Sequence, residues 1–115
     1  LKNEEGFDEE DFIFVKSNLK KRKVFLNELR YIEALGDYVK MVTEHDSLVV
    51  LSTMKAFEAL LPKDRFLRIH KSYIVNLDKV IRYNSKVIEL EKEELPLSRN
   101  RKTDLVQALA ANNKD

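Results

Sequence analysis

The chain has no cysteine, only two glycines and two histidines, and no long apolar run. Without cysteine it forms no disulfide and no thiolate metal site, and His45 and His70 alone make a histidine metal site a poor expectation. Two glycines exclude a glycine-rich phosphate loop. No run approaches the ~18 apolar residues of a membrane-spanning helix, and no signal peptide is visible. We therefore expect a cytoplasmic protein with no metal and no cofactor.

Charge is distributed unevenly along the chain. The first 11 residues hold six of the 20 acidic residues and one of the 21 basic residues, which leaves 20 basic and 14 acidic residues in 12–115. A basic domain behind an acidic segment is compatible with nucleic-acid binding, although this balance is also ordinary for a soluble domain. We interpret 1–11 as an interdomain linker, 12–111 as one domain and 112–115 as a frayed end. Because the chain starts with Leu1, we expect it to be a fragment of a longer protein.

Short β-rich segments dominate the pattern. Strands are predicted at 11–16, 20–26, 30–35, 38–43, 48–51, 80–83 and 86–90, with a helical turn at 27–29 and an edge segment at 95–97. Ser52 and Thr53 are candidate caps of a helix that Pro62 ends; its core residues are Met54, Phe57, Leu60 and Leu61. Ser98 is expected to cap a second helix that faces the core through Leu105, Leu109 and Val106. The prediction is a mostly-β fold, with small antiparallel sheets stacked in an elongated sandwich and two short α-helices.

Segment 66–76 begins as an alternating strand, but its polar positions are unusual: Arg68, His70, Lys71 and Ser72. If the segment stays extended, Arg68, His70 and Ser72 share one face. Lys71 breaks the alternation, so either it lies at an edge or the strand bends into a loop there. Arg68 and Lys71 can neutralise phosphates, and Ser72 and Asn76 can form hydrogen bonds to a nucleic acid. A lone histidine such as His70 more often makes a structural hydrogen bond.

A second basic string, Ser98-Arg99-Asn100-Arg101-Lys102, stands at the predicted start of the last helix. Cations in the first turn oppose the helix dipole, which favours acidic residues there. A bound phosphate would reverse this penalty, because backbone N–H groups, the dipole and three cations would converge on it. The alternative is solvated surface charge that Asp104 partly compensates.

The remaining charged clusters have simpler interpretations. Lys20-Lys21-Arg22-Lys23 is typical of a solvated strand edge. Glu91, Glu93 and Glu94 are expected to be solvated charges in a turn. No Ser/His/Asp spacing stands out, so we do not expect an enzyme. A nucleotide or acidic-sugar enzyme would require a pocket of perturbed carboxylates, which the sequence does not indicate.

Three segments resemble the signatures of LytTR-type DNA-binding domains. The first is Tyr31-Ile32-Glu33-Ala34 followed by Gly36-Asp37-Tyr38-Val39. The second is Leu60-Leu61-Pro62 followed by 66–76. The third is Leu95-Pro96-Leu97-Ser98-Arg99, with Lys102 a little further on. The resemblance covers roughly residues 12–110 in the order and spacing of the family.

The resemblance implies a mostly-β fold that inserts loops into successive major grooves of double-stranded DNA. It further implies the output domain of a bacterial two-component response regulator that controls transcription, behind a phosphorylatable receiver domain. Members of the family commonly bind two direct repeats as a dimer. The acidic linker fits a position just after such a receiver.

The resemblance also implies roles for individual residues. Base contacts are expected from Lys71, Arg99, Asn100, Asp37 and Tyr38, and phosphate contacts from Arg68, Ser72, Lys40, Arg101 and Lys102. His70 is expected to support its loop. Asp37 is acidic, so a base contact there requires a donor such as a cytosine amine. The alternative function is a protein-interaction module that docks an acidic partner, such as the receiver, through the same basic face.

Overall fold

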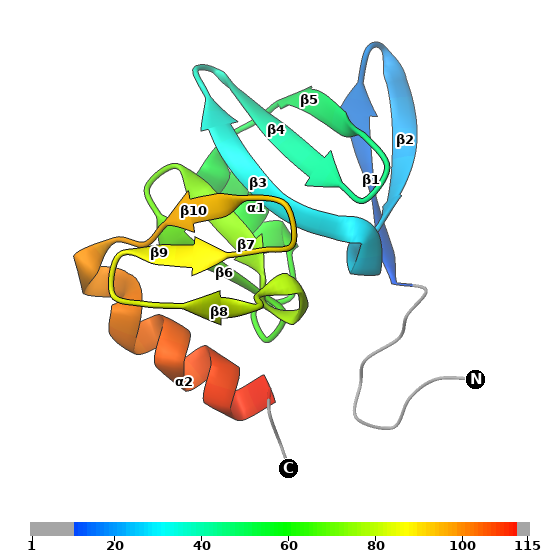
Figure 1. The fold of residues 1–115 in the computed structure, drawn as a ribbon. Helices are drawn as coiled ribbons and strands as arrows, with labels where there is room; N and C mark the ends of the chain where they lie inside the picture. The colour runs from blue at the N-terminus through cyan, green and yellow to red at the C-terminus, as the bar shows by residue number, and fades with distance from the viewer. Residues whose placement is uncertain (1–10, 113–115) are drawn as a thin grey trace.

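The structure is a computed structural model that describes residues 11–112. Figure 1 shows its strands and helices in chain order. The strands are β1 (Phe12–Ser17), β2 (Lys20–Phe25), β3 (Leu29–Leu35), β4 (Tyr38–Thr43), β5 (Ser47–Leu51), β6 (Phe66–His70), β7 (Tyr73–Asn76), β8 (Arg82–Tyr83), β9 (Val87–Glu89) and β10 (Glu94–Pro96). The helices are α1 (Met54–Leu60) and α2 (Lys102–Asn112), with 3-10 turns η1 (Leu26–Glu28), η2 (Leu77–Lys79) and η3 (Arg99–Arg101).

The strands form three antiparallel sheets. A five-stranded sheet has the order β5-β4-β3-β7-β6, β1 and β2 form a two-stranded sheet, and β10-β9-β8 form a three-stranded sheet. The predicted mostly-β fold with several antiparallel sheets and two helices is confirmed. No helix in the described part of the chain is long and apolar enough to cross a bilayer.

The five-stranded sheet is packed on both faces, which explains why its central strands are almost continuously apolar. Side chains alternate along a strand, so Ile32 and Ile74 enter one core, whereas Tyr31 and Val75 enter a second. The first core lies against the β1–β2 hairpin and α1, and the second lies against β8–β10 and α2. Leu105, fully buried, anchors α2 in the second core.

The two helix starts differ. Thr53 caps α1 as predicted, because its side-chain oxygen accepts a hydrogen bond from the Ala56 N–H at 3.0 Å. Ser98 instead precedes the 3-10 turn η3, makes no side-chain capping bond, and α2 begins only at Lys102. The prediction of a Ser98 side-chain cap is therefore wrong. Val106 is 42% exposed rather than in the core, and Asn112 is still helical; residues 113–115 lie outside the described residues.

Segment 66–76 is a hairpin and not one extended strand. Strands β6 and β7 are joined by a turn at Lys71 and Ser72, so Arg68, His70 and Ser72 do not share a strand face. A bulge leaves Ile69 out of the β6–β7 register, and its carbonyl accepts a hydrogen bond from the Ser98 N–H at 2.8 Å. The alternative in which the chain bends at Lys71 is the correct one.

An ion-pair network inside the molecule was not expected. Arg30 lies where the β3–β4 register shifts, is 3% exposed, and pairs with Glu44 at 3.2 Å and with Glu93. Lys79 of η2 also pairs with Glu44, at 2.7 Å. Burial lowers the pKa of Arg30, but the two carboxylates outweigh this effect and the pKa lies above its ordinary value. The interpretation of Glu93 as a solvated turn charge is therefore wrong.

The basic run in β2 is only partly solvated. Arg22 pairs with Asp46 through two hydrogen bonds, and the Lys23 ammonium lies 4.3 Å from the centre of the Phe12 ring. Lys20 and Lys21 are exposed, as expected for a strand edge. Asp11, the one residue of the predicted linker that the structure describes, accepts a hydrogen bond from the Leu26 N–H through its carbonyl. The rest of the predicted linker, 1–10, lies outside the described residues.

Candidate nucleic-acid interface

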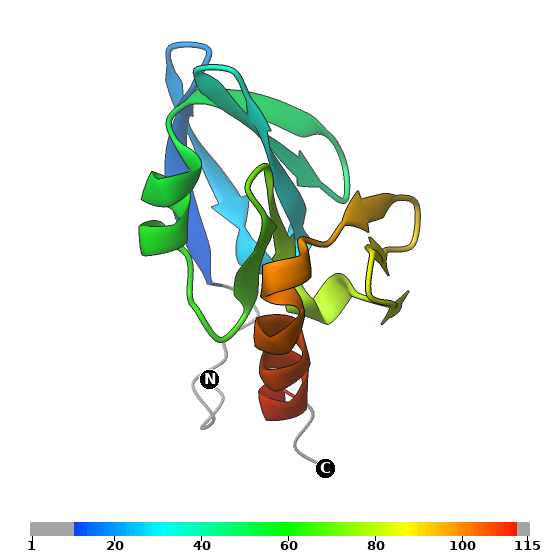
Figure 2. The same ribbon diagram turned by 90° about the vertical axis from the view of Figure 1, so that its left-hand side faces the viewer.

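Three connecting segments lie next to one another on one face of the molecule. They are the β3–β4 turn at Gly36-Asp37, the β6–β7 turn at Lys71-Ser72, and η3. Figure 2 shows this face, with the three segments in a line from the β3–β4 turn at the top to η3. Two backbone hydrogen bonds of 2.8 Å tie them together, from Ala34 N–H to the Ser72 carbonyl and from Ser98 N–H to the Ile69 carbonyl. We call this surface the loop face.

The β6–β7 turn holds an exposed lysine on a supported backbone. Arg68 donates to the Lys71 carbonyl at 2.6 Å and to Glu58 of α1 at 3.0 Å. His70 accepts a hydrogen bond from the Ser72 N–H at its Nδ1, which requires a ring with its proton on Nε2. The Lys71 side chain is exposed and makes no ion pair with any described residue. The turn therefore presents one free cation, while Arg68 and His70 fix the backbone beneath it.

The segment around η3 is the second source of free charge. Arg99, Asn100 and Lys102 are exposed, and neither Arg99 nor Lys102 forms an ion pair within residues 11–112. Asp104 reaches only Arg101, at 3.9 Å. Because α2 starts at Lys102, Arg99 and Arg101 belong to the preceding 3-10 turn and not to the first α-helical turn. The turn η3 runs directly into α2, so the expected convergence of these three cations on one phosphate at the start of the helix stays a prediction.

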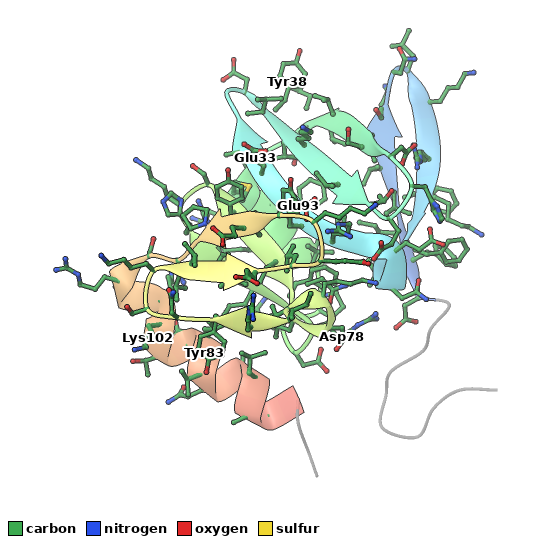
Figure 3. All side chains as sticks on the ribbon, viewed as in Figure 1. Glu33, Tyr38, Asp78, Tyr83, Glu93 and Lys102 are labelled. Atoms are coloured by element: carbon green, nitrogen blue, oxygen red, sulfur yellow. The ribbon has the colours of Figure 1, made fainter. Side chains whose placement is uncertain are left out.

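The β3–β4 turn closes the other end of the loop face. Gly36 has φ +63°, a backbone conformation that most other residues adopt only with strain. Tyr38 is 47% exposed, and Asp37 is exposed beside it. Figure 3 shows Tyr38 and Lys102 far apart, near the two ends of this face. The face thus has an acidic and aromatic end and a basic end.

A shallow cavity of about 410 Å³ joins the β3–β4 turn to the β6–β7 turn. Its charged and aromatic lining comes from Asp37, Tyr38, Lys55, Arg68 and Lys71. Lys55 belongs to the first turn of α1, and it was not among the predicted site residues. The sequence carries no signal for it, because a lysine on a short amphipathic helix is ordinary surface charge unless the helix is known to border the site.

Two further residues of the sequence prediction, Lys40 and Asn76, lie in strands. Lys40 is half-buried and stands opposite Glu33 in the β3–β4 register. Glu33 also accepts a hydrogen bond from the Tyr73 hydroxyl at 3.2 Å, and burial together with this carboxylate raises the pKa of Tyr73. Asn76 is completely buried, and its Nδ2 donates to the Leu29 carbonyl at 2.8 Å. Asn76 is therefore a structural residue, and the idea that it contacts a nucleic acid is wrong.

No group of three or more histidine, aspartate or glutamate residues that could hold a metal occurs among residues 11–112. Six of the predicted residues on the segments of the loop face are exposed, and Arg101 is half-buried. The six are Asp37, Tyr38, Lys71, Arg99, Asn100 and Lys102. Arg68 lies on the same face, but its guanidinium is held between Glu58 and the Lys71 carbonyl. A surface of free cations on supported turns is suited to a polyanion.

Comparison with known proteins agrees with this geometry. The family model of the LytTr DNA-binding domain matches residues 20–110. Among solved structures, the chain is similar to one described as the LytTr DNA-binding domain of a methyl-accepting/DNA response regulator from Bacillus cereus. The TM-score is 0.74 at 24% identity, over 86% of this chain and 96% of that chain. None of the curated proteins compared with the chain matches it.

Proposed function

We propose, from the premise that this chain belongs to the LytTr DNA-binding domain family, that it reads a specific duplex sequence through its loop face. The family is one of DNA-binding domains and not of enzymes. What the family match leaves open is how the chain contacts DNA. The observation that carries the proposal is a set of free cations, Lys71, Arg99 and Lys102. They stand on two of the three segments that backbone hydrogen bonds hold side by side.

Lys71 and Arg99 are the base-reading side chains in this proposal. Both are exposed, both stand on turns instead of regular strands, and neither is engaged by an acidic residue of the described chain. In the major groove the N7 and O6 atoms of guanine accept hydrogen bonds from lysine or arginine. Asn100 beside Arg99 suits adenine, and Asp37 suits the amine of cytosine. Tyr38 adds an apolar surface at the far end of the face.

Phosphate contacts set the position of the domain on the duplex. Lys102, Arg101, Lys40 and Ser72 are the candidates, because phosphate contacts position a protein without reading sequence. We assign Arg68 a supporting role together with His70, because its guanidinium already has two acceptors within the protein. Lys55 joins the phosphate candidates because it lines the cavity beside Lys71.

We place this DNA reader in a bacterial two-component system, as the cytoplasmic output domain of a response regulator that controls transcription. The description of the Bacillus cereus relative as a response regulator and the acidic segment before the domain support this placement. Binding as a dimer on direct repeats is part of the same proposal. Dimer binding predicts that the preferred duplex contains two copies of one short motif in the same orientation.

The decisive experiment is selection of bound duplexes from a random pool, followed by competition against random duplex in the same buffer. We expect an enriched motif that wild-type protein prefers over random sequence by at least the ~10³-fold typical of specific DNA binding. Equal affinity for all duplexes would contradict sequence reading. Tight binding of an acidic protein without any preferred duplex would favour the protein-interaction alternative instead.

A further inference from the structure

An apolar groove borders the loop face at Tyr38, and its other side chains have no role in the proposed DNA contact. It has a volume of about 540 Å³ and lies between the β1–β2 turn, β5 and α1. Three leucines on its walls are strongly exposed: Leu19 at 89%, Leu51 at 70% and Leu60 at 51%. Tyr38 and Val49 extend the same apolar surface, at 47% and 44% exposure. In Figure 2, α1 stands on the flank opposite the β8–β10 sheet.

Leu19 is an unexpected residue at its position. The β1–β2 hairpin turns through Asn18 and Leu19, whose φ angles are +56° and +68°. Two-residue turns with positive φ at both positions favour asparagine and glycine, and a leucine there is strained. The Leu19 side chain is almost fully exposed, so the fold gains no core packing that would offset the strain. Strained and exposed positions of this kind concentrate at functional surfaces.

The charged side chains on the β1–β2 hairpin side of the groove are all basic. Residues 12–25 contain no aspartate or glutamate. Lys16 lines the groove, and Lys20 and Lys21 stand opposite Ser17 and Lys16 in the hairpin register. None of these three lysines forms an ion pair with a described residue, whereas Arg22 in the same hairpin is paired with Asp46. An occupant of the groove therefore meets apolar side chains in the centre and uncompensated positive charge along the hairpin side.

We propose that this groove docks an amphipathic helix of a protein partner, with an apolar face flanked by acidic residues. The apolar walls take the leucine-type anchors, and Lys16, Lys20 and Lys21 pair with the acidic flank. A helix fits better than an added strand, because β1 packs against β5 and the Ser17 hydroxyl already donates to the Val49 carbonyl at 2.9 Å. The edge of β5 is thus not free along its length for strand pairing.

The docked helix would lie close to bound DNA but would not need it. Tyr38 and Ser52 line both the groove and the cavity of the loop face, so the two surfaces meet at these residues. The proposal does not depend on sequence reading by Lys71 or Arg99. A partner at this position would be a neighbouring protein on the same duplex, for which the groove supplies a contact point.

The test is a selection of 16-residue peptides from a random display library against the whole chain, with Leu51→Asp as the counter-target. Leu51 is exposed, so this variant is expected to fold as the wild type does, which its thermal midpoint checks. We expect peptides with leucine or phenylalanine at helical spacing and with flanking aspartate or glutamate. Synthetic copies should bind wild type at least tenfold more tightly than Leu51→Asp. The proposal would be overturned if the selection enriched basic peptides. It would also be overturned if no enriched peptide distinguished wild type from Leu51→Asp.

Two further variants separate docking from folding. Leu19→Gly relieves the left-handed strain and removes the anchor, so it should keep or raise the thermal midpoint while the selected peptide loses affinity. The double variant Lys16→Glu, Lys20→Glu should reverse the preference. It should bind a copy of the peptide with lysine in place of each acidic residue more tightly than the acidic peptide itself. Docking of a partner helix would be contradicted if Leu19→Gly bound the peptide as tightly as wild type does. It would also be contradicted if wild type associated with itself and Leu51→Asp abolished that association. The DNA competition above reports on the loop face alone.

Discussion

Arg30 and Arg99 are the same residue type in opposite surroundings. Arg30 is 3% exposed and is held by Glu44 and Glu93, from the β4–β5 and β9–β10 connections. Arg99 is exposed on η3 and is paired with no acidic residue of the described chain. The interior arginine joins three parts of the fold. Loss of the exposed arginine, in contrast, breaks no ion pair among the described residues.

The difference separates stability from binding. A buried charge must be paired, because an unpaired one pays the full desolvation penalty. An exposed charge that remains unpaired keeps its hydrogen-bonding capacity for a ligand. On this view, substitutions in the Arg30 network should change the free energy of unfolding, and substitutions on the loop face should change only DNA affinity. Substitutions at the two kinds of position test this division between stability and binding.

Arg30→Met should have the largest effect. It leaves Glu93 without its partner and deprives Glu44 of one of two cations, so we expect a loss of about 3 kcal/mol in the free energy of unfolding. Urea denaturation measures it. The matched control is Arg99→Met, which should stay within about 0.5 kcal/mol of wild type, as surface substitutions usually do. Equal losses in the two variants would contradict the division.

Arg99→Ala should have the largest effect on DNA binding. We expect a loss of about 1–3 kcal/mol on the selected duplex, with relaxed preference at one base pair and an unchanged thermal midpoint. Lys71→Ala should behave in the same way at a different base pair. Fluorescence anisotropy against single-base variants of the duplex measures both. Arg82→Ala is the control, because Arg82 is exposed on β8 and pairs with Glu89; a similar loss there would show that any surface arginine matters.

Acid should weaken the interior network through Glu44. The hydrogen bond and ion pair with Lys79, followed by Arg30, lower the pKa of Glu44 below its ordinary value of 4.5. A lowered native pKa means that the stabilisation is fully present above about pH 4.5 and is lost as the pH falls through the native pKa. Glu44→Gln should cost about 1 kcal/mol at pH 7 and should flatten the dependence of stability on pH below 4.5. If the difference in stability between wild type and Glu44→Gln persists at pH 2, the charge of Glu44 is not responsible for it.

Lys102→Ala should have the smallest effect. It removes one exposed cation near the start of α2, so affinity for every duplex should fall alike by less than about 1 kcal/mol at moderate salt. The slope of log affinity against log salt concentration should decrease in magnitude by about 1. Lys79→Ala is a useful comparison, because Lys79 belongs to the Glu44 network and should change stability but not the slope. If Lys102→Ala lost affinity only for duplexes with one particular base pair, Lys102 would belong with Lys71 and Arg99 as a base-reading residue.

The sequence was sufficient for local features of the fold and not for contacts between distant segments. A nearly continuous apolar run identified β4, and Ser52-Thr53 before Met54 indicated the cap of α1, because both depend on neighbours in sequence. Glu93 was misassigned because its partner, Arg30, lies 63 residues earlier in the chain. Ser98 was expected to act through its side chain, yet its backbone N–H bonds to Ile69 of β6. The turn at Gly36-Asp37 and the possible bend at Lys71 followed from residue patterns, and the expectation that loops contact DNA followed from the family resemblance.

The same reasoning applies to the candidate site. Charge and exposure of Lys71 and Arg99 were readable from the basic strings, because such residues rarely become buried. The engagement of Arg68 was not readable, since Glu58 lies on α1 and only the fold brings the two together. Lys55 escaped notice for the same reason. Sequence patterns thus indicate which residues are charged, and the fold decides which charges remain free.

The bulge at Ile69 has a consequence for how this domain could change its preferred site. The spacing between the two proposed readers is maintained by main-chain atoms, the Ile69 carbonyl and the Ser98 N–H, which every amino acid except proline supplies at those positions. Replacement of Lys71 or Arg99 therefore leaves the frame that holds them intact. Under the proposed function, new recognition specificities can therefore arise at either residue independently, on an unaltered scaffold.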